Sequence, residues 1–107
     1  HTTLAAGRWQ SFSLAEQLGN IGSEISRALH WQEKDPLFYG KAIERALELI
    51  DLTLADPRWR HRLKEITRLR EFLCRNYLQE QNFKTDLSAL NDYCMQFALA
   101  ARASHNV

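Results

Sequence analysis

The sequence predicts an all-α protein that folds as an antiparallel up-down four-helix bundle. Apolar residues recur at spacings of three and four in four segments, at about residues 14–34, 36–55, 57–78 and 86–102, and this spacing places them on one face of an α-helix. Of the 107 residues, 45% are hydrophobic, and only four are glycine and two proline. Helices of similar length with short connections pack most economically as antiparallel neighbours.

A chain of this length fits a single domain, 1–107, whose core buries about two-thirds of the unfolded surface. Residues 1–11 and 104–107 lie outside the periodic segments, and we expect them to be flexible. The formal net charge of +1 gives the whole molecule no strong attraction to nucleic acids or acidic membranes. An electrostatic partner therefore has to be sought in local clusters of charge.

The first helix is expected to begin directly after Ser13. Ser13 and Glu16 form the S-x-x-E pattern of a capping box, in which each side chain accepts a hydrogen bond from an otherwise unpaired backbone N–H. An apolar stripe follows at spacings of four and three, made of Leu14, Leu18, Ile21, Ile25 and Leu29. Beside it runs a small-residue stripe, made of Ala15, Gly19, Gly22 and Ser26. Small side chains let another backbone approach, so this stripe predicts a close helix crossing, a self-association face or a ligand slot.

Two Asp-Pro pairs predict the starts of the second and third helices. Asp35 and Asp56 supply N-cap acceptors, and the fixed φ of the proline that follows suits the first helical position. The second helix then carries an apolar stripe of Ala42, Ile43, Ala46, Leu47, Ile50 and Leu54; the third carries Trp59, Leu63, Ile66, Leu69, Leu73 and Tyr77. In an alternative, the prolines kink longer helices and a second chain completes the bundle.

Residues 79–85 lack periodicity and predict a loop before the fourth helix, whose stripe is Leu87, Leu90, Cys94, Phe97 and Ala101. The two cysteines, Cys74 and Cys94, form no C-x-x-C pair and are interpreted as structural thiols. No apolar run approaches the ~18 residues of a membrane span. We therefore expect a cytoplasmic protein without a membrane partner.

The third helical segment concentrates the positive charge. Seven of the fourteen Lys and Arg residues lie between Arg58 and Arg75. On a helical wheel, four cations share the face opposite the apolar stripe: Arg60, Lys64, Arg68 and Arg75. Cations four residues apart on a helix are separated by ~6 Å, which is comparable with the spacing of phosphates along a strand. We expect this face to contact nucleic-acid phosphates in a salt-sensitive way, and an exposed Trp59 or Phe72 to add base stacking.

Two other interpretations of this face stay open. Residues 57–78 carry seven basic and two acidic side chains, a net of +5, whereas residues 35–56 carry two basic and five acidic ones, a net of −3. Neighbouring helices can thus neutralise each other, and Glu71 can pair with Arg68 and Arg75, which leaves a merely solvated face. Alternatively, the face docks on the acidic surface of a partner protein, and the chain is an interaction adaptor.

Arg70 is predicted to lie on the core side of the third helix, between Leu63 and Ile66 on the wheel. Removing a guanidinium from water costs several kcal/mol unless a carboxylate meets it. We therefore expect a buried ion pair between Arg70 and an acidic residue of another helix, the candidates being Glu16, Glu24, Glu48 and Asp51.

Motifs for catalysis, metals or cofactors do not occur in the sequence: it lacks Glu-x-x-His, G-x-x-x-x-G-K and G-x-S-x-G. We expect a non-enzymatic binding or assembly module without a metal or cofactor. Its expected partners are a second copy of itself, nucleic acid or an acidic protein. An enzymatic alternative requires an internal pocket at Arg70 with His30 or Cys74 nearby.

Overall fold

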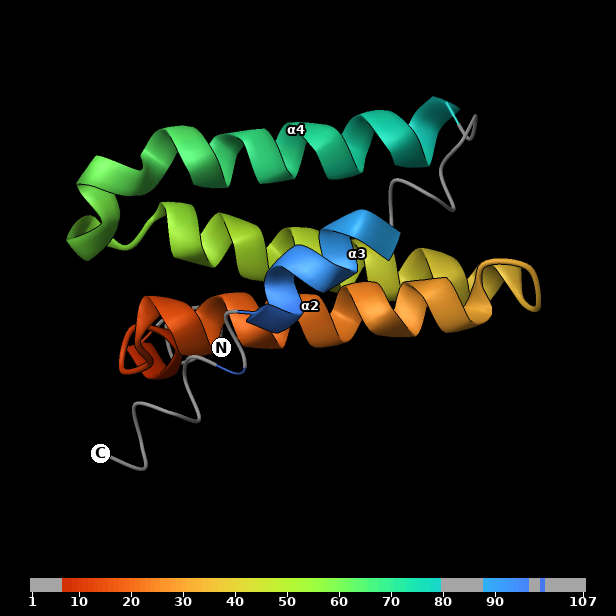
Figure 1. The fold of residues 1–107 in the computed structure, drawn as a ribbon, viewed down its shortest axis with the longest axis horizontal. Coiled ribbons are helices and arrows are strands. Elements are labelled where there is room, and N and C mark those ends of the chain that lie inside the picture. The colour runs from red at the N-terminus through yellow and green to blue at the C-terminus, as the bar shows by residue number, and fades with distance from the viewer. Residues whose placement is uncertain (1–6, 80–87, 97–98, 100–107) are drawn as a thin grey trace.

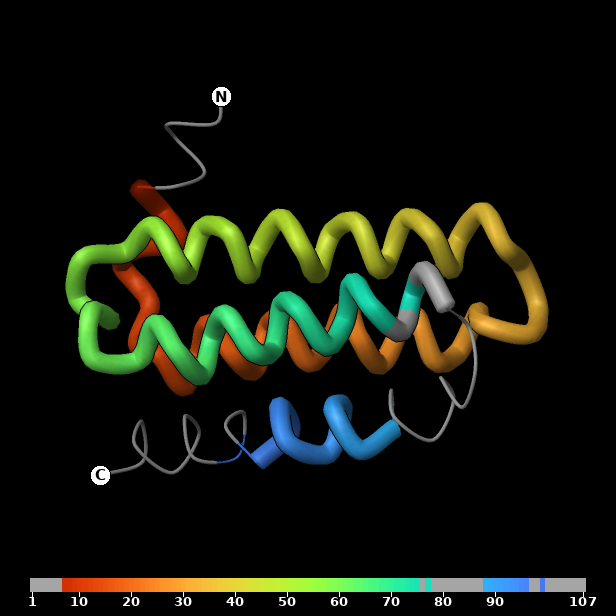
Figure 2. The backbone as a smooth tube through the Cα atoms, turned by 90° about the horizontal axis from the view of Figure 1, so that it is seen from above, coloured from red at the N-terminus to blue at the C-terminus, as the bar shows by residue number. Residues whose placement is uncertain are grey.

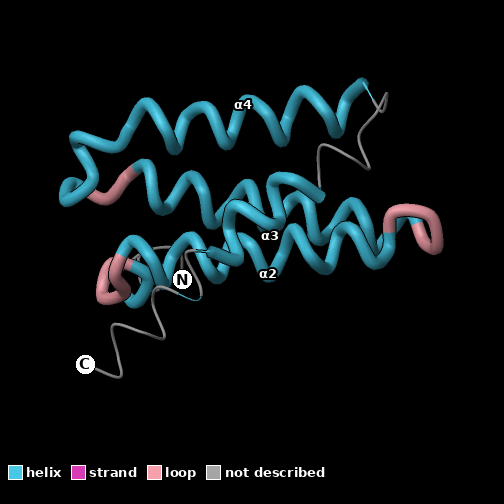
Figure 3. The backbone as a smooth tube through the Cα atoms, viewed as in Figure 1, coloured by secondary structure: helices cyan, strands magenta, loops and turns pink. Residues whose placement is uncertain are grey.

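The computed structural model describes residues 7–79, 88–96 and 99. Helices form the regular secondary structure of this part of the chain, so the all-α prediction is confirmed. The long helices are α2 (Leu14–Trp31), α3 (Pro36–Leu54) and α4 (Leu63–Gln79), and the 3-10 helix η1 (Pro57–Arg62) leads into α4. Residues 88–96 are also helical. Figure 3 shows short loops between successive elements of the described chain.

Successive helices alternate in direction. In Figure 1, α2, α3 and α4 run roughly parallel to one another. Figure 2 shows α3 to one side of α2 and α4, which overlap in that view. The colours in Figure 2 show that α3 runs against α2 and that α4 runs against α3. The two views together show that residues 88–96 and α3 lie on opposite sides of α2 and α4. The most extensive contact between elements joins α2 to α3, and the next joins α3 to α4.

The capping box at the start of α2 is confirmed. The Ser13 hydroxyl accepts from the Glu16 N–H at 3.1 Å, and the Glu16 carboxylate accepts from the Ser13 N–H at 2.9 Å. The helix ends at Trp31, three residues before the predicted end at residue 34. The Trp31 carbonyl accepts from the N–H groups of Lys34 and Asp35, and this turn stops the helix before the next one begins.

Both Asp-Pro pairs begin helices, and neither lies inside one. The Asp35 carboxylate accepts from the N–H groups of Leu37 and Phe38 at 2.9 and 3.3 Å, so α3 begins at Pro36 as predicted. The Asp56 carboxylate accepts from the Arg58 N–H at 3.0 Å and begins η1 in the same way.

The prediction of one helix over residues 57–78 is wrong. The backbone of Trp59, with φ −103° and ψ 28°, interrupts the helical conformation inside η1, before α4 begins at Leu63. A 3-10 helix has about 3.0 residues per turn against 3.6 in an α-helix, so a single wheel misplaces the residues before Leu63. Leu63 itself, predicted to belong to the core stripe, is 40% exposed.

The predicted fourth helix, residues 86–102, has both its ends outside the described residues. Residues 88–96 and 99 are helical within it. The predicted flexible segment 104–107 also lies outside the described part, as do residues 1–6 of the segment 1–11. Trp9 of that first segment is only 6% exposed, because residues 7–12 pack against α2 and α3.

The core fills the space between the helices. Complete burial of one aliphatic side chain stabilises the folded state by roughly 1.5–3 kcal/mol. The helices α2, α3 and α4 and residues 88–96 all supply side chains to one hydrophobic cluster. The largest of its members that are less than 2% exposed are Ile21, Ile25, Ile43, Ile50, Leu73 and Cys94. Among the described residues, no helix combines the length and the apolar character needed to cross a bilayer.

Candidate functional site

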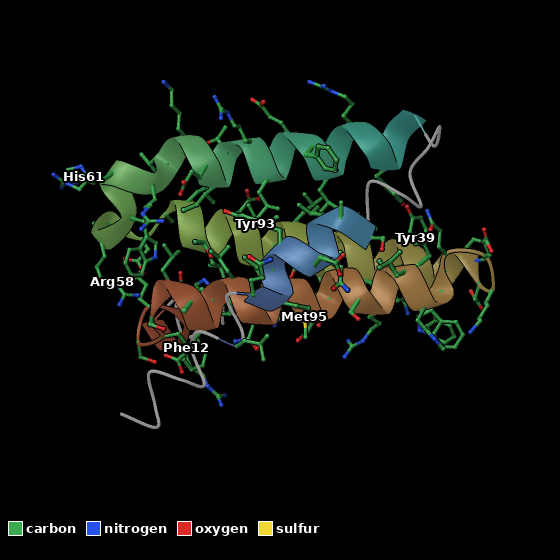
Figure 4. The ribbon with its side chains drawn as sticks, viewed as in Figure 1. Phe12, Tyr39, Arg58, His61, Tyr93 and Met95 are labelled. Carbon is green, nitrogen blue, oxygen red and sulfur yellow. The ribbon has the colours of Figure 1, made fainter. Side chains whose placement is uncertain are left out.

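Three cations form a basic strip along the outer face of α4: Lys64, Arg68 and Arg75. All three are exposed, and no hydrogen bond or ion pair joins any of them to another residue of the described chain. Figure 4 shows side chains with nitrogen ends along the edge of α4 that faces away from α3. Glu71, which was expected to pair with Arg68 and Arg75, is exposed and forms no ion pair within the described residues. The basic strip is therefore accessible to an anionic partner.

Arg60 does not continue the basic strip, although the sequence predicted that it would. It lies in η1, outside α4, and is exposed. Each residue of a 3-10 helix turns by about 120° instead of 100°, so the α-helical wheel that aligned Arg60 with Lys64 and Arg68 does not apply to it. His61 in the same turn points outward at the end of the molecule in Figure 4. Arg62 pairs with Glu65 at 3.2 Å, and both side chains are more than half exposed.

An apolar groove of about 300 Å³ lies directly beside the basic strip, between α4 and residues 88–96. Two aromatic side chains line it, Phe72 at 38% and Tyr93 at 42% exposed. Partial burial raises the pKa of Tyr93 above its usual value, so its phenol keeps its proton. Arg68 belongs both to the strip and to the groove, whose other lining residues are Glu65, Leu69 and Leu90. A cation and two accessible aromatic rings thus share one small surface.

Arg70 forms an ion pair with Asp51, one of the four acids considered, at 2.6 Å between Nε and Oδ1. The prediction that this pair is buried is wrong, because the two side chains are 41% and 54% exposed. Leu73 and Ile66 fill the interior, and Arg70 reaches along the edge between α4 and α3 to solvent. The Asp51 carboxylate raises the pKa of Arg70. A pair this exposed contributes little to stability.

The small-residue stripe of α2 is used for a close crossing within the chain. A methyl group added at Gly22 would lie 2.5 Å from the Cβ of Cys94 in the segment 88–96. Gly19 is also buried, Ala15 is half-buried, and Ser26 is exposed. Because Cys94 covers Gly22, this part of the stripe is closed to a second copy of the chain.

A buried polar network that the sequence did not predict lies at the end of the molecule where residues 7–12 meet the α3–η1 turn. Gln17, Thr53 and Asp56 are at most 2% exposed. The Trp9 indole donates to Thr53 Oγ1 at 2.9 Å, the Gln17 amide donates to the Trp9 carbonyl at 2.9 Å, and the Trp59 indole donates to Gln17 Oε1 at 2.8 Å. The available signal was Gln17 itself, a polar residue three positions after Leu14 in the apolar face of α2.

Arg58 closes this network from outside. Its guanidinium donates to both oxygens of Asp56, the shortest contact being 2.6 Å, and to the Phe12 carbonyl at 2.7 Å. It also lies over the Trp59 ring, 4.3 Å from the centroid. The Arg58 hydrogen bonds hold the pKa of Asp56 below its usual value against the opposing effect of burial. Arg58 and Phe12 lie at the same end of the molecule in Figure 4, so Arg58 is occupied with structure and is no part of the basic strip.

The structure brings together some components of the enzymatic alternative. Arg70 Nη1 lies 3.7 Å from Cys74 Sγ, whereas the His30 ring packs against Trp31, with centroids 4.8 Å apart. Neither Arg70 nor Cys74 lines the groove beside α4 or the cavities along α2 and α3. In the described residues, no group of three or more His, Cys, Asp or Glu side chains is placed to hold a metal ion.

Comparison with known proteins gives no relative. No family model matches the sequence, and neither a curated protein nor a solved structure matches the chain. The chemistry of the described surface is therefore the basis for inferring a function.

Proposed function

We propose that this chain is a four-helix up-down bundle that binds single-stranded nucleic acid along α4, without catalysing a reaction. The observation that carries the proposal is the basic strip of Lys64, Arg68 and Arg75 beside a groove lined by Phe72 and Tyr93. The alternating directions of the helices and the contact of residues 88–96 with α2 support the bundle.

In this proposal, the strip binds phosphates and the groove binds a base. Each phosphate neutralised on a single strand releases about 0.7 counterion, which makes the affinity fall as salt rises. Arg68 lines the groove, so a phosphate on Arg68 brings the neighbouring base over Phe72 and Tyr93. Stacking on an aromatic side chain is worth roughly 1–3 kcal/mol per base and does not depend on its identity. The proposed binding is therefore weak to moderate, salt-sensitive and tolerant of sequence.

The groove favours a single strand over a duplex. A duplex keeps its bases stacked on one another and presents phosphates alone, so Phe72 and Tyr93 would contribute nothing to it. Three cations in a line cannot by themselves give more than weak, non-specific binding. A clear preference for single strands is thus the signature of the groove.

The test is fluorescence anisotropy with a labelled 12-nucleotide RNA at low and physiological salt. We expect the double charge reversal Lys64→Glu/Arg68→Glu to weaken binding at least tenfold, and Phe72→Ala to weaken it several-fold. The matched control is Lys41→Glu, which reverses an exposed cation on α3 and should leave the affinity nearly unchanged. The proposal fails if binding ignores salt, or if Lys41→Glu weakens it as much as reversal of a strip cation does.

The alternative function is an adaptor that docks the basic strip on an acidic partner protein. The exposed Phe72 and Tyr93 suit a protein interface as well. This alternative is favoured if the chain binds no RNA or DNA while an acidic protein binds in a manner that depends on Lys64 and Arg68. A cytoplasmic location is part of either proposal, and the free thiols of Cys74 and Cys94 fit it.

A further inference from the structure

A second groove runs along the outer face of α2 and α3, and no residue of α4 lines it. It consists of two adjoining cavities of about 600 and 360 Å³. The two cavities share Glu24, Arg27 and Arg45, so they are parts of one continuous feature. We call this feature the α2/α3 groove.

The α2/α3 groove follows one helical face of each helix. Its lining residues on α2 recur at spacings of four and three: Asn20, Glu24, Arg27 and Trp31. On α3 they recur in the same way: Phe38, Lys41, Arg45, Leu49 and Leu52. Because α2 and α3 are antiparallel, the ends of the two series meet, and the rings of Trp31 and Phe38 lie 4.9 Å apart. On α2 the lining runs from Asn20 to Trp31, and on α3 it runs from Phe38 to Leu52. At 1.5 Å per residue these two stretches span about 17 and 21 Å.

Apolar and cationic side chains alternate along this groove. Leu49 is 5% exposed and lies in the floor, whereas Phe38 is 47% exposed at one end. The Lys41 and Arg8 side chains add positive charge near the two ends. Counting the lining residues of both cavities gives four cations and one acid, Glu24. An occupant with an apolar face and negative charge complements this surface.

Arg27 and Arg45 flank the middle of the groove from opposite helices. Each has an acidic neighbour on its own helix: Glu24 lies 3.2 Å from Arg27, and Glu48 lies 3.1 Å from Arg45. The two arginine side chains are 61% and 54% exposed, whereas Glu24 is 14% and Glu48 is 64% exposed. The Arg45–Glu48 pair is therefore a weak surface pair, and Arg27 stays largely exposed beside its partner. Two guanidinium groups that face one groove repel each other, and an anion placed between them attracts both.

We propose that the α2/α3 groove binds an acidic amphipathic helix of a partner protein, with carboxylates between Arg27 and Arg45 and apolar side chains over Leu49 and Phe38. Helices dock in such grooves through apolar residues at spacings of three and four, which is the spacing of the lining itself. A helix of about 15 residues, or four turns, matches the length of the lining on α3. This function is independent of the nucleic-acid surface on α4, because the two surfaces have no residue in common.

A nucleic acid fits the α2/α3 groove less well than a helix does. Its phosphates would contact the arginines, but they would leave the apolar floor at Leu49 and Leu52 uncovered. The exposed ring of Phe38 already packs on Trp31, so it offers only one face to a base. An amphipathic helix covers the floor and satisfies the cations at the same time.

The test uses a labelled synthetic peptide of 18 residues, built as a helix with leucine along one face and glutamate on its flanks. A shuffled peptide of the same composition, which cannot gather its leucines on one face, is the reference. We expect the helical peptide to bind at least tenfold more tightly than the shuffled one. Lys41→Glu and Phe38→Ala should each weaken binding about tenfold. The first puts a negative charge beside the glutamates of the peptide, and the second removes an apolar contact with its leucines.

The matched control is Lys64→Glu on α4, which should not change the affinity for the peptide. A saturating labelled RNA should not displace the peptide either, so failure of this inference is distinguishable from failure of the nucleic-acid proposal. The inference is overturned if the two peptides bind alike, if Lys64→Glu weakens peptide binding as much as Lys41→Glu does, or if no peptide binds at millimolar concentration. It is also overturned if Lys41→Glu reduces the affinity for RNA while leaving that for the peptide unchanged.

Discussion

Replacing Gly22 with alanine tests the closest approach between two segments of this chain. Gly22 is buried in α2, and the added methyl group would lie 2.5 Å from Cys94 Cβ, 3.4 Å from its carbonyl carbon and 3.5 Å from its Cα. Carbon atoms in contact are normally ~3.5–4.0 Å apart. The segment 88–96 must therefore retreat from α2 by roughly 1 Å. It must do so as a backbone unit, because Cys94 Cβ is bonded directly to the main chain and cannot rotate away, and the other two atoms belong to the main chain.

Two opposing effects set the magnitude. Alanine is favoured over glycine inside a helix by about 1 kcal/mol, while overpacking a filled interior costs ~1–3 kcal/mol. The cost at residue 22 should lie at the upper end of this range, since a whole helical segment has to move. We therefore expect Gly22→Ala to lower the free energy of unfolding by about 2 kcal/mol, which corresponds to a loss of roughly 8 °C in Tm for a domain of this size.

Gly40→Ala is the matched control for this experiment. Gly40 also lies inside a helix, α3, but its added methyl group would meet only the Tyr77 hydroxyl, at 3.3 Å. The end of one side chain can move aside, so the gain in helix propensity should dominate and Gly40→Ala should be neutral or stabilising by up to ~1 kcal/mol. Urea denaturation followed by circular dichroism measures both variants against the unmodified chain.

The reasoning is refuted if Gly22→Ala is as stable as Gly40→Ala. A second variant isolates the contact itself: Cys94→Gly removes the opposing Cβ. In the double variant Gly22→Ala/Cys94→Gly, the alanine should no longer destabilise relative to Cys94→Gly alone, so the double-mutant cycle should give a coupling of about 2 kcal/mol.

Three further predictions concern single side chains. Asp56→Ala should lower the free energy of unfolding by roughly 3 kcal/mol, since it removes an N-cap and charge-assisted hydrogen bonds from Arg58. The control Asp51→Ala, at an exposed ion pair, should cost less than ~1 kcal/mol. Equal costs for the two variants would contradict the burial of Asp56. The pKa of Asp56 is lowered in the folded state. The contribution of Asp56 to stability is therefore complete above its unfolded pKa of ~3.9 and is lost as the pH falls through the lower folded value. Acid denaturation of Asp56→Asn should lack this part of the transition, and an unchanged profile would disprove the linkage. Burial raises the pKa of Cys94 to about 12, so iodoacetamide at pH 8 should alkylate Cys74 and spare Cys94 in the native protein, which mass spectrometry detects; similar rates at both thiols would be inconsistent with the buried position.

The sequence predicted the starts of the first three helices well, because each start is encoded locally. Ser13 and Glu16 satisfy each other within four residues, and the Asp-Pro pairs place an acceptor beside the N–H groups that need it. The end of α2 was missed because no glycine or proline marks Trp31. The break at Trp59 was missed for a different reason: it depends on an indole hydrogen bond to Gln17, a residue 42 positions away, which no local pattern reveals.

The surfaces were predicted less completely than the helices. The outward cations Lys64, Arg68 and Arg75 follow from the periodicity of one helix, and the structure leaves them exposed. The groove beside them requires Tyr93, which a separate segment brings against α4. The depth of Arg70 could not be judged from a wheel, because burial at the flank of a helix depends on how closely the neighbouring helix approaches. The α2/α3 groove likewise exists only once two antiparallel faces are set side by side.

The turn of η1 has a mechanical consequence for everything that follows it. Ile66 and Leu73 face inward on the same rigid rod from which Lys64 and Arg68 face outward, so one angular setting governs both. Deleting a single residue from η1 would rotate α4 by about 100°, which would expose its apolar side chains and bury its charged ones at the same time. The length of the six-residue stretch Pro57–Arg62 sets the rotation of α4 about its own axis. Changes of length in this turn should thus be far less tolerated than changes of residue type.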